Sequence, residues 1–446
     1  MLAPVPSATA TQNHVTSDSP SAPSPASSPK GSASRPHGRT GLWLVGARGA
    51  ISTCVAYGIA GIRQELIPPA GLPTAFPPLS ELDLVPLEHL VLGGHDVCTR
   101  DLSASAGELV AAGILPADLV SMARDDAARF EAAIRPGILD VAETGFRDLD
   151  PRAAALGALS PLEQTEAIER DLAAFRTEHK LETVIVVYLA STEAASKRQA
   201  VWDSTRDFEA AVAGGVPQPV SLLYAYAAIR SGLPFVNFTP SIGANVPALI
   251  ELAESKGVPI AGNDGKTGET LVKTALAPMF RARALQVLAW QGYNMLGNRD
   301  GEVLRDPNHK AAKLETKDAA LRSILGGADG ASTAGGDRFH SQVSIDYVPS
   351  LGDWKTAWDF IHFEGFLGTK MSMQFTWSGC DSALAAPLVI DLARLAEFAA
   401  RGGESGVLEH LGCYFKAPLG SQEHDFHRQM QALYTYAQQQ SSKGNQ

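Results

Sequence analysis

Cysteine is scarce in this chain, with four residues among 446, and its placement excludes two kinds of stabilising site. Cys54, Cys98, Cys380 and Cys413 form no CxxC pair, which argues against a structural zinc site. A chain of this length can bury a large core, so a disulfide framework is not expected either. Apolar runs long enough to span a membrane are also missing, and the first forty residues lack the apolar segment of a secretory signal. We therefore expect a cytoplasmic protein with no membrane partner and no metal.

Net positive charge is lacking as well. Lys and Arg total 37 against 48 Asp and Glu, which gives a formal net charge of −11. A nucleic-acid surface needs a basic face that neutralises phosphates, so this balance argues against a nucleic-acid partner. A small anionic substrate remains possible, because a local group of lysines can be positive inside an acidic protein.

Residues 1–40 are rich in Ser, Pro, Ala and Thr and contain almost no large apolar side chains. Such a segment cannot bury enough surface to offset the entropy lost on ordering, so we predict a disordered N-terminal extension. A targeting role is the alternative. A second stretch of small residues, 326–336, is typical of a surface loop.

Beyond residue 40, short apolar segments alternate with helical patterns. Strands are predicted at 41–46, 89–94, 183–192, 233–240 and 258–260, and helices at 51–64 and 246–256. Apolar strands that end in loops and alternate with helices imply a parallel sheet covered on both faces. We predict a Rossmann-like, doubly wound α/β domain.

The pattern changes after residue 317. Met371, Met373, Phe375 and Trp377 alternate with polar residues, as expected for a strand with one buried and one polar face. Another strand is predicted at 343–347, and an apolar helix at 382–400. We predict an inserted α+β domain, with boundaries at 41–262 for the first domain, 263–380 for the insertion and 381–446 for the return to the first domain.

The first predicted strand ends in the glycine-rich turn VGARGAIST. Gly46 and Gly49, followed by Ser52, approximate a dinucleotide-binding turn, where glycines let the backbone approach a pyrophosphate at a helix N-terminus. Arg48 and Ser52 replace two glycines of that pattern, so an ordinary tight turn is the alternative. Asp96, after the second strand, is expected either to bond ribose hydroxyls or to cap a helix.

Four lysines lie within residues 262–317. Lys266 and Lys273 are seven residues apart and would share a helix face if 267–277 is helical, with Lys266 at the helix N-terminus. Lys313 and Lys317 form an i,i+4 pair that is repulsive unless an anion lies between them. Solvated surface lysines are the alternative for either pair alone. Two pairs beside the polar loop NMLGNRDG indicate a site for an anion.

Two residues nearer the C-terminus carry further hypotheses. Asp353, in SLGDWKTAWD, is predicted to lie in a turn before a tryptophan-rich helix, where it either caps that helix or orients a catalytic lysine. Lys416, in FKAP, either extends to solvent or acts as an acid or base. The HExxH, GxSxG and P-loop motifs are absent from the sequence, which argues against a metalloprotease, a serine hydrolase and a P-loop NTPase.

Taken in order, these segments resemble the myo-inositol-1-phosphate synthase family, also called inositol-3-phosphate synthases. The likeness runs from about Gly41 to about Leu419. The chain departs from the family in two places, with GARGAIS where the family has GxGGNNG and NFTPSIG where it has NGSPQNT. The segments that carry the likeness are DGKTGET from Asp264, NMLGNRDG from Asn294, the pair Lys313 and Lys317, YVPSLGD ending at Asp353, CDSALAAP from Cys380, and FKAP around Lys416.

The resemblance implies an isomerase, an intramolecular lyase that converts D-glucose 6-phosphate to 1D-myo-inositol 3-phosphate in inositol and phospholipid biosynthesis. In the family, NAD oxidises C5 of the sugar, a proton leaves C6, the enolate attacks the C1 aldehyde, and C5 is reduced again. The resemblance also implies that the first domain binds NAD, and that the insertion carries catalysis and assembles a homotetramer. Two alternatives stay open: an NAD-dependent sugar-phosphate dehydrogenase, and a non-catalytic homologue that binds NAD or sugar phosphate.

The resemblance also assigns roles to residues, and the chemistry of the reaction suits them. An enolate and an alkoxide develop negative charge, which fixed cations stabilise more than the neutral ground state. The expected catalytic residues are Lys266, Lys273, Lys313, Lys416 and Asp353, which orients a lysine. The expected substrate-binding residues are Asn294, Asn298, Asp300 and Lys317, the last being the least important lysine. The expected cofactor-binding residues are Gly46, Ala47, Arg48, Gly49, Ala50, Ile51, Ser52, Asp96, Ser191, Thr192, Asp264, Asp381 and Ser382.

Overall fold

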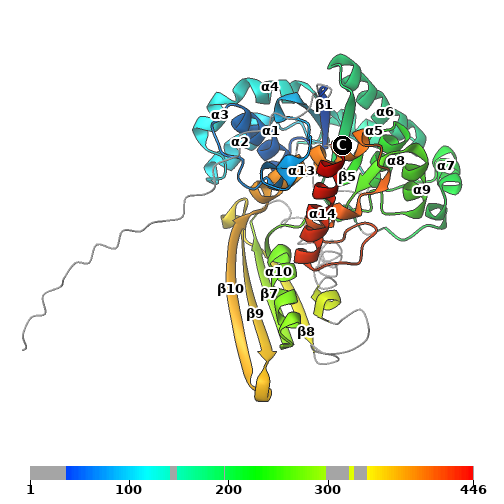
Figure 1. The fold of residues 1–446 in the computed structure, drawn as a ribbon. Coiled ribbons are helices and arrows are strands. Elements are labelled where there is room, and N and C mark those ends of the chain that lie inside the picture. The colour runs from blue at the N-terminus through cyan, green and yellow to red at the C-terminus, as the bar shows by residue number, and fades with distance from the viewer. Residues whose placement is uncertain (1–36, 141–147, 195, 298–320, 326–338, 445–446) are drawn as a thin grey trace, which may run out of the picture. The chain divides into compact units, whose positions relative to one another are not determined.

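The computed structural model describes residues 37–140, 148–194, 196–297, 321–325 and 339–444. The strands within these ranges form two sheets, one of seven strands and one of four (Figure 1). No helix in these ranges is long and apolar enough to cross a bilayer.

The seven-stranded sheet has the order β11-β6-β5-β4-β1-β2-β3, and all of its pairings are parallel. Strands β2 and β3 are therefore added on one side of β1, and the strands from β4 onward are added on the other side, so the strand order reverses between β1 and β4. A crevice forms at such a switch point, at the carboxyl ends of the strands, and commonly binds a ligand. The strands are β1 (Thr40–Val45), β2 (Leu90–Asp96), β3 (Ile134–Pro136), β4 (Thr183–Tyr188), β5 (Phe235–Asn237), β6 (Pro259–Ala261) and β11 (Gly406–Val407).

Helices cover both faces of this sheet, which confirms the predicted doubly wound α/β fold. Alternate side chains of β1 enter different cores: Leu42 and Leu44 pack with α1, α2, α4 and α13, while Trp43 packs with α6, α8 and α9. Burial on both faces explains why β1 and β4 are continuous apolar segments. The helices are α1 (Ala50–Arg63), α2 (Leu102–Ala111), α3 (Ala117–Met122), α4 (Arg124–Ala132), α5 (Pro151–Gly157), α6 (Pro161–Glu178), α7 (Thr205–Ala213), α8 (Val220–Arg230), α9 (Pro247–Lys256), α10 (Gly268–Ala282), α13 (Asp381–Arg401) and α14 (Phe426–Gly444).

The four-stranded sheet has the order β10-β9-β7-β8, with β7 and β8 parallel and the other pairs antiparallel. Helix α10 packs on it through Ala277 and Phe280, which join Trp290 and Ile361 in a separate core. The chain enters this sheet after β6 and leaves it directly into α13, which packs on the first sheet (Figure 1). The strands are β7 (Gln286–Leu296), β8 (His340–Tyr347), β9 (Trp354–Glu364) and β10 (Lys370–Cys380).

The helix predicted after Asp353 is wrong, because that segment is strand β9. Its side chains alternate, with Lys355, Ala357 and Ile361 buried and Trp358 exposed. Trp354, Thr356, Trp358 and Phe360 stand at every second position, which favours a strand, and this period outweighs the presence of Trp and Ala. The other strands and helices predicted in the described ranges have counterparts whose ends differ by a few residues.

Candidate active site

A cavity of about 1390 Å³ opens at the carboxyl ends of β1, β2 and β4 and is also lined by residues of the second sheet. It therefore includes the switch point of the first sheet, where the strand order reverses. Residues from the starts of α1, α10 and α13 complete its wall. A pocket of this size, with polar groups converging from several elements, is a candidate active site.

The glycine-rich turn forms one wall of the cavity. Gly46 has a φ of +95°, which strains any other residue, and a Cβ there would be crowded by the carbonyl oxygen of Leu189 at 3.0 Å. The backbone N–H groups of Gly46 and Ala47 donate to the carbonyl oxygen of His95 at 2.8 and 3.0 Å. The hydroxyl of Ser52, in the position of a family glycine, donates to the carbonyl oxygen of Gly46 at 2.8 Å. These hydrogen bonds stabilise the tight turn, although Arg48 and Ser52 stand where the family has glycine.

The first turn of α1 faces the cavity, since Ala50, Ile51 and Ser52 all line it. The N–H groups at a helix N-terminus, together with the helix dipole, favour an anion such as a pyrophosphate. Ala47 differs from its neighbours, because its side chain is fully buried in the core beneath the turn and not in the cavity wall. The turn, the helix end and the φ of Gly46 fit a dinucleotide.

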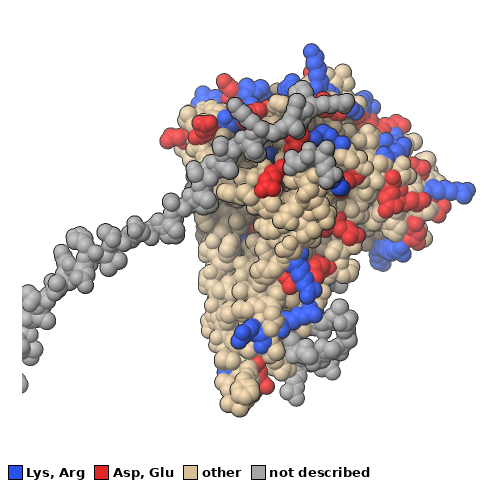
Figure 2. Space-filling model, viewed as in Figure 1, with Lys and Arg blue, Asp and Glu red and all other residues tan. Residues whose placement is uncertain are grey.

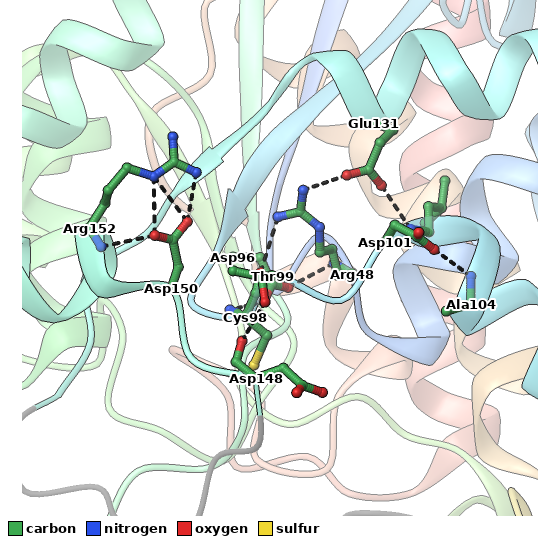
Figure 3. A network of polar contacts seen from close by, with 11 residues as sticks. Arg48, Asp96, Cys98, Thr99, Asp101, Ala104, Glu131, Asp148, Asp150 and Arg152 are labelled. Atoms are coloured by element: carbon green, nitrogen blue, oxygen red, sulfur yellow. Dashed lines mark hydrogen bonds and ion pairs between the residues drawn. The ribbon is translucent and has the colours of Figure 1, made fainter.

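Asp96 ends β2 and lines the cavity. Its carboxylate accepts the backbone N–H groups of Arg48, at 2.7 Å, and Cys98, at 2.9 Å (Figure 3). Burial raises the pKa of Asp96, and these hydrogen bonds oppose that rise. The alternative of a helix cap is wrong, because Asp101 caps α2 by accepting the N–H of Ala104. Asp96 thus remains a candidate for ribose hydroxyls.

Two lysine–carboxylate pairs face the same cavity. The ammonium nitrogen of Lys355 lies 2.6 and 2.8 Å from the two carboxylate oxygens of Asp381, and that of Lys416 lies 2.7 Å from Asp264. All four residues line the cavity. In each pair the carboxylate balances the charge of the ammonium group, so the cavity wall carries two lysine ammonium groups without an unpaired buried charge.

Lys355 is a residue that the sequence analysis missed. It lies two residues before Ala357 on the buried face of β9, so reading the segment as a strand would have found it. Gly268 lies beside it, where a φ of +53° strains any other residue and a Cβ would meet the Lys355 ammonium nitrogen at 2.6 Å. The carboxylate that orients this lysine is Asp381. The contacts of Asp353, which lines the cavity too, include the hydroxyl of Ser382 and the thiol of Cys380 at 3.1 Å.

Lys266 and Lys273 do not share a helix face, and neither lines the cavity. Helix α10 begins at Gly268, so Lys266 precedes it, and its backbone N–H bonds to the carbonyl oxygen of Tyr414 at 2.7 Å. The Lys266 ammonium group bonds to the side-chain oxygen of Gln429 on α14. Burial lowers the pKa of Lys266 to about 8. Only Lys273 belongs to this helix, so the seven-residue spacing does not bring the two lysines onto one face.

Lys273 belongs instead to a buried group of charges under the second sheet. Its ammonium nitrogen lies 2.6 Å from Glu269 and 3.5 Å from Asp359, and all three side chains are at most 3% exposed. Trp290 donates its indole N–H to Asp359 at 2.7 Å. Burial and the neighbouring Glu269 raise the pKa of Asp359 to about 6. Glu269, which the sequence analysis missed, also lines the cavity.

The remaining predicted site residues divide into two groups. Asn294 lines the cavity and donates to the carbonyl oxygen of Ser344 at 3.4 Å. The four residues Asn298, Asp300, Lys313 and Lys317 lie outside the described residues, as does the loop predicted at 326–336. The predicted cofactor residues that line the cavity are Gly46, Arg48, Gly49, Ala50, Ile51, Ser52, Asp96, Ser191, Thr192, Asp264, Asp381 and Ser382.

Comparison with known proteins places the chain in a family. A sequence model of an NAD-binding family, myo-inositol-1-phosphate synthase, matches residues 72–437. The chain belongs to the myo-inositol-1-phosphate synthase family. This membership confirms the resemblance derived from the ordered motifs, and NAD is the cofactor of the family's nucleotide-binding domain.

Two relatives with similar sequences are named as inositol-3-phosphate synthases. Inositol-3-phosphate synthase 1 of Bacteroides thetaiotaomicron is 32% identical over 405 residues, which cover 88% of this chain and 91% of that protein. Inositol-3-phosphate synthase 1 of rice is 30% identical over 324 residues, which cover 71% of this chain and only 62% of the rice protein.

Two crystal structures share the fold. Inositol-3-phosphate synthase of Caenorhabditis elegans matches with a TM-score of 0.77 at 24% identity, covering 90% of this chain and 86% of that one. A myo-inositol-1-phosphate synthase-related protein of Thermotoga maritima matches with a TM-score of 0.71 at 22% identity, covering 90% of this chain and 99% of that one.

Proposed function

We propose that the protein is an inositol-3-phosphate synthase, an isomerase that converts D-glucose 6-phosphate to 1D-myo-inositol 3-phosphate. The observation that carries this proposal is the meeting of two lysine–carboxylate pairs and a dinucleotide-type turn in one cavity. NAD, when bound, supplies oxidation and later re-reduction at one sugar carbon, so the reaction has no net redox change. The remaining chemistry falls to the side chains of the second sheet and its neighbours.

The cofactor is held by the turn and by the residues around it. The first-turn N–H groups of α1 take the pyrophosphate, and Asp96 takes ribose hydroxyls. Of the thirteen residues predicted for this role, Ala47 contributes only by packing beneath the turn, since it does not line the cavity.

Lys355 and Lys416 stabilise the negative oxygens that form during enolisation and ring closure. Their carboxylate partners fix each ammonium group in place before the reaction, so little reorganisation is needed when charge develops. Asp381 and Asp264 therefore position the two lysines. Asn294 binds the substrate from β7, and Asn298, Asp300, Lys313 and Lys317 stay assigned to the substrate from the family resemblance.

Lys266 and Lys273 are positioning residues in this proposal, because neither ammonium group reaches the cavity wall. Lys273 holds Glu269, which lines the cavity. Lys266 ties the segment before α10 to Gln429 on α14. Loss of either lysine would displace groups that touch the substrate.

Assembly as a cytoplasmic homotetramer through the second sheet is part of the proposal. Tyr293, Met295 and Trp358 lie on one face of that sheet with 36–40% of their surface exposed. The rings of Tyr293, Trp358, Phe360 and His362 follow one another across this face. Their neighbours on β10 in the register, Gln374 beside Phe360 and Thr376 beside Trp358, are uncharged. The edge of the sheet at β10 also carries few charged side chains (Figure 2). An exposed aromatic face with little charge is typical of a subunit interface.

The function is tested by incubating the purified protein with D-glucose 6-phosphate and NAD and following the product by phosphorus NMR. An inositol monophosphate should appear without accumulation of NADH. NADH formed in proportion to sugar would instead indicate a sugar-phosphate dehydrogenase. Light scattering after size-exclusion chromatography tests the tetramer, and a monomer would contradict that part of the proposal.

A further inference from the structure

Arg48 occupies a position in the glycine-rich turn where the family pattern has glycine, and its side chain has a defined place. It lines the cavity, and its guanidinium donates to the carbonyl oxygen of Cys98 at 3.2 Å. The same guanidinium forms an ion pair with Glu131 on the last turn of α4 (Figure 3). The backbone N–H of Arg48 donates to Asp96 at 2.7 Å.

These contacts place a positive charge beside the carboxyl end of β2. In a doubly wound sheet, the acidic residue at this point faces the ribose 2′-hydroxyl of NAD, and an arginine nearby accommodates the 2′-phosphate of NADP. Cys98 lies only two residues beyond Asp96, so the guanidinium of Arg48 reaches the region where these two cofactors differ.

Glu131 determines whether the positive charge of Arg48 can attract a phosphate. One of its carboxylate oxygens bonds to Arg48, and the other accepts the backbone N–H of Leu102 at 2.8 Å. The carboxylate is thus fixed from two sides and cannot easily turn away. The single positive charge of Arg48 lies beside two carboxylates, those of Glu131 and Asp96. A phosphate placed here would therefore meet a net negative charge.

We propose that the Arg48–Glu131 pair sets the preference of this protein for NAD over NADP. Glu131 neutralises the arginine that would otherwise bind a 2′-phosphate, and its own charge repels that phosphate. This proposal concerns only the binding of the dinucleotide. It can therefore be wrong while the proposed sugar chemistry is right, and the sugar chemistry can be wrong while this proposal is right.

The test is isothermal titration of the full chain and its variants with NAD and with NADP, in the absence of sugar. Unmodified protein should bind NAD at least about tenfold more tightly than NADP. Glu131→Gln keeps an oxygen that can accept the Leu102 N–H but releases Arg48, and should raise NADP affinity at least about tenfold while NAD affinity changes less than about threefold. Glu131→Ala, measured in parallel in case the amide disturbs α2, should show the same gain.

Two controls assign the effect to Arg48. The double variant Arg48→Ala/Glu131→Gln should lose the gain in NADP affinity. Asp126, on the same helix as Glu131, pairs with Arg63 and Arg129, and none of these three residues lines the cavity. Asp126→Asn therefore removes one carboxylate without releasing an arginine of the cavity wall, and it should leave NADP affinity unchanged. An equal gain with Asp126→Asn, a gain that persists in the double variant, or tighter binding of NADP by the unmodified protein would each overturn the proposal.

Discussion

The two walls of the cavity are built by different means. On the side of the first sheet, the backbone provides the site: a positive φ at Gly46, hydrogen bonds to His95, and the open N–H groups of α1. On the side of the second sheet, the site consists of charged side chains held in pairs, such as Lys355 with Asp381. The first wall carries Arg48 and Ser52 where the family has glycine, and hydrogen bonds within the turn and the positive φ of Gly46 hold its backbone. The second depends on the particular ammonium and carboxylate groups.

Loss of a paired lysine tests the second wall and should have the largest effect. Lys416→Met and Lys355→Met should each lower kcat at least about a hundredfold, the usual cost of removing a group that stabilises a developing oxyanion. Steady-state kinetics with D-glucose 6-phosphate measures this. Lys256→Met, at an exposed position on α9, is the control and should leave kcat unchanged. Near-normal turnover in both Lys416→Met and Lys355→Met would show that the side chains of this wall are dispensable.

A single added methyl group tests the first wall. Gly46→Ala should weaken NAD binding and destabilise the fold by about 1–2 kcal/mol or more, because the left-handed conformation is unfavourable for alanine. The added Cβ would also crowd the backbone at Leu189.

Gly58→Ala is the matched control for this substitution. Gly58 lies inside α1, where a Cβ meets no atom within 4 Å, so alanine should stabilise the protein by about 0.5–1 kcal/mol. Thermal unfolding and NAD titration distinguish the two outcomes. Equal stability of the two variants would mean that the turn does not require its backbone geometry.

The buried charges of the second wall should show themselves in the pH dependence of stability. The pKa of Asp359 is raised from 3.8 to about 6, so the folded protein holds this proton more tightly than the unfolded chain. Asp359 therefore costs stability as the pH rises through this window. The melting temperature of Asp359→Asn relative to the unmodified protein should rise between pH 4 and about pH 6. A difference that falls or stays constant would contradict the assignment.

The first wall was more accessible to sequence analysis than the second. Strands β1 and β4 are buried on both faces, so they are continuous apolar runs bounded by glycine or polar residues, and this signal is local. The turn after β1 could be found for the same reason. The partners of the lysines are tertiary contacts: Lys416 pairs with Asp264 across 152 residues, and Lys355 with Asp381 across 26. No spacing rule predicts such pairs.

Lys355 was missed for a different reason. The alternation of β9 was present in the sequence, but Trp and Ala residues suggested a helix, and a helix period does not place Lys355 beside Asp381. The spacing of Lys266 and Lys273 misled in the same way, since a helical period was applied to a residue that precedes the helix. In both cases a helical period was assigned to residues that lie outside a helix.

Both walls of the cavity are proposed to serve one reaction, in which the cofactor is used and restored while the sugar stays bound. The most direct test uses D-glucose 6-phosphate carrying deuterium at C5, with the product followed by NMR and the NADH absorbance band recorded in parallel. The product should be inositol monophosphate that retains the label at C5, with no steady rise in NADH. Loss of the label to solvent or to the bulk cofactor pool, with NADH accumulating as sugar is consumed, would contradict it.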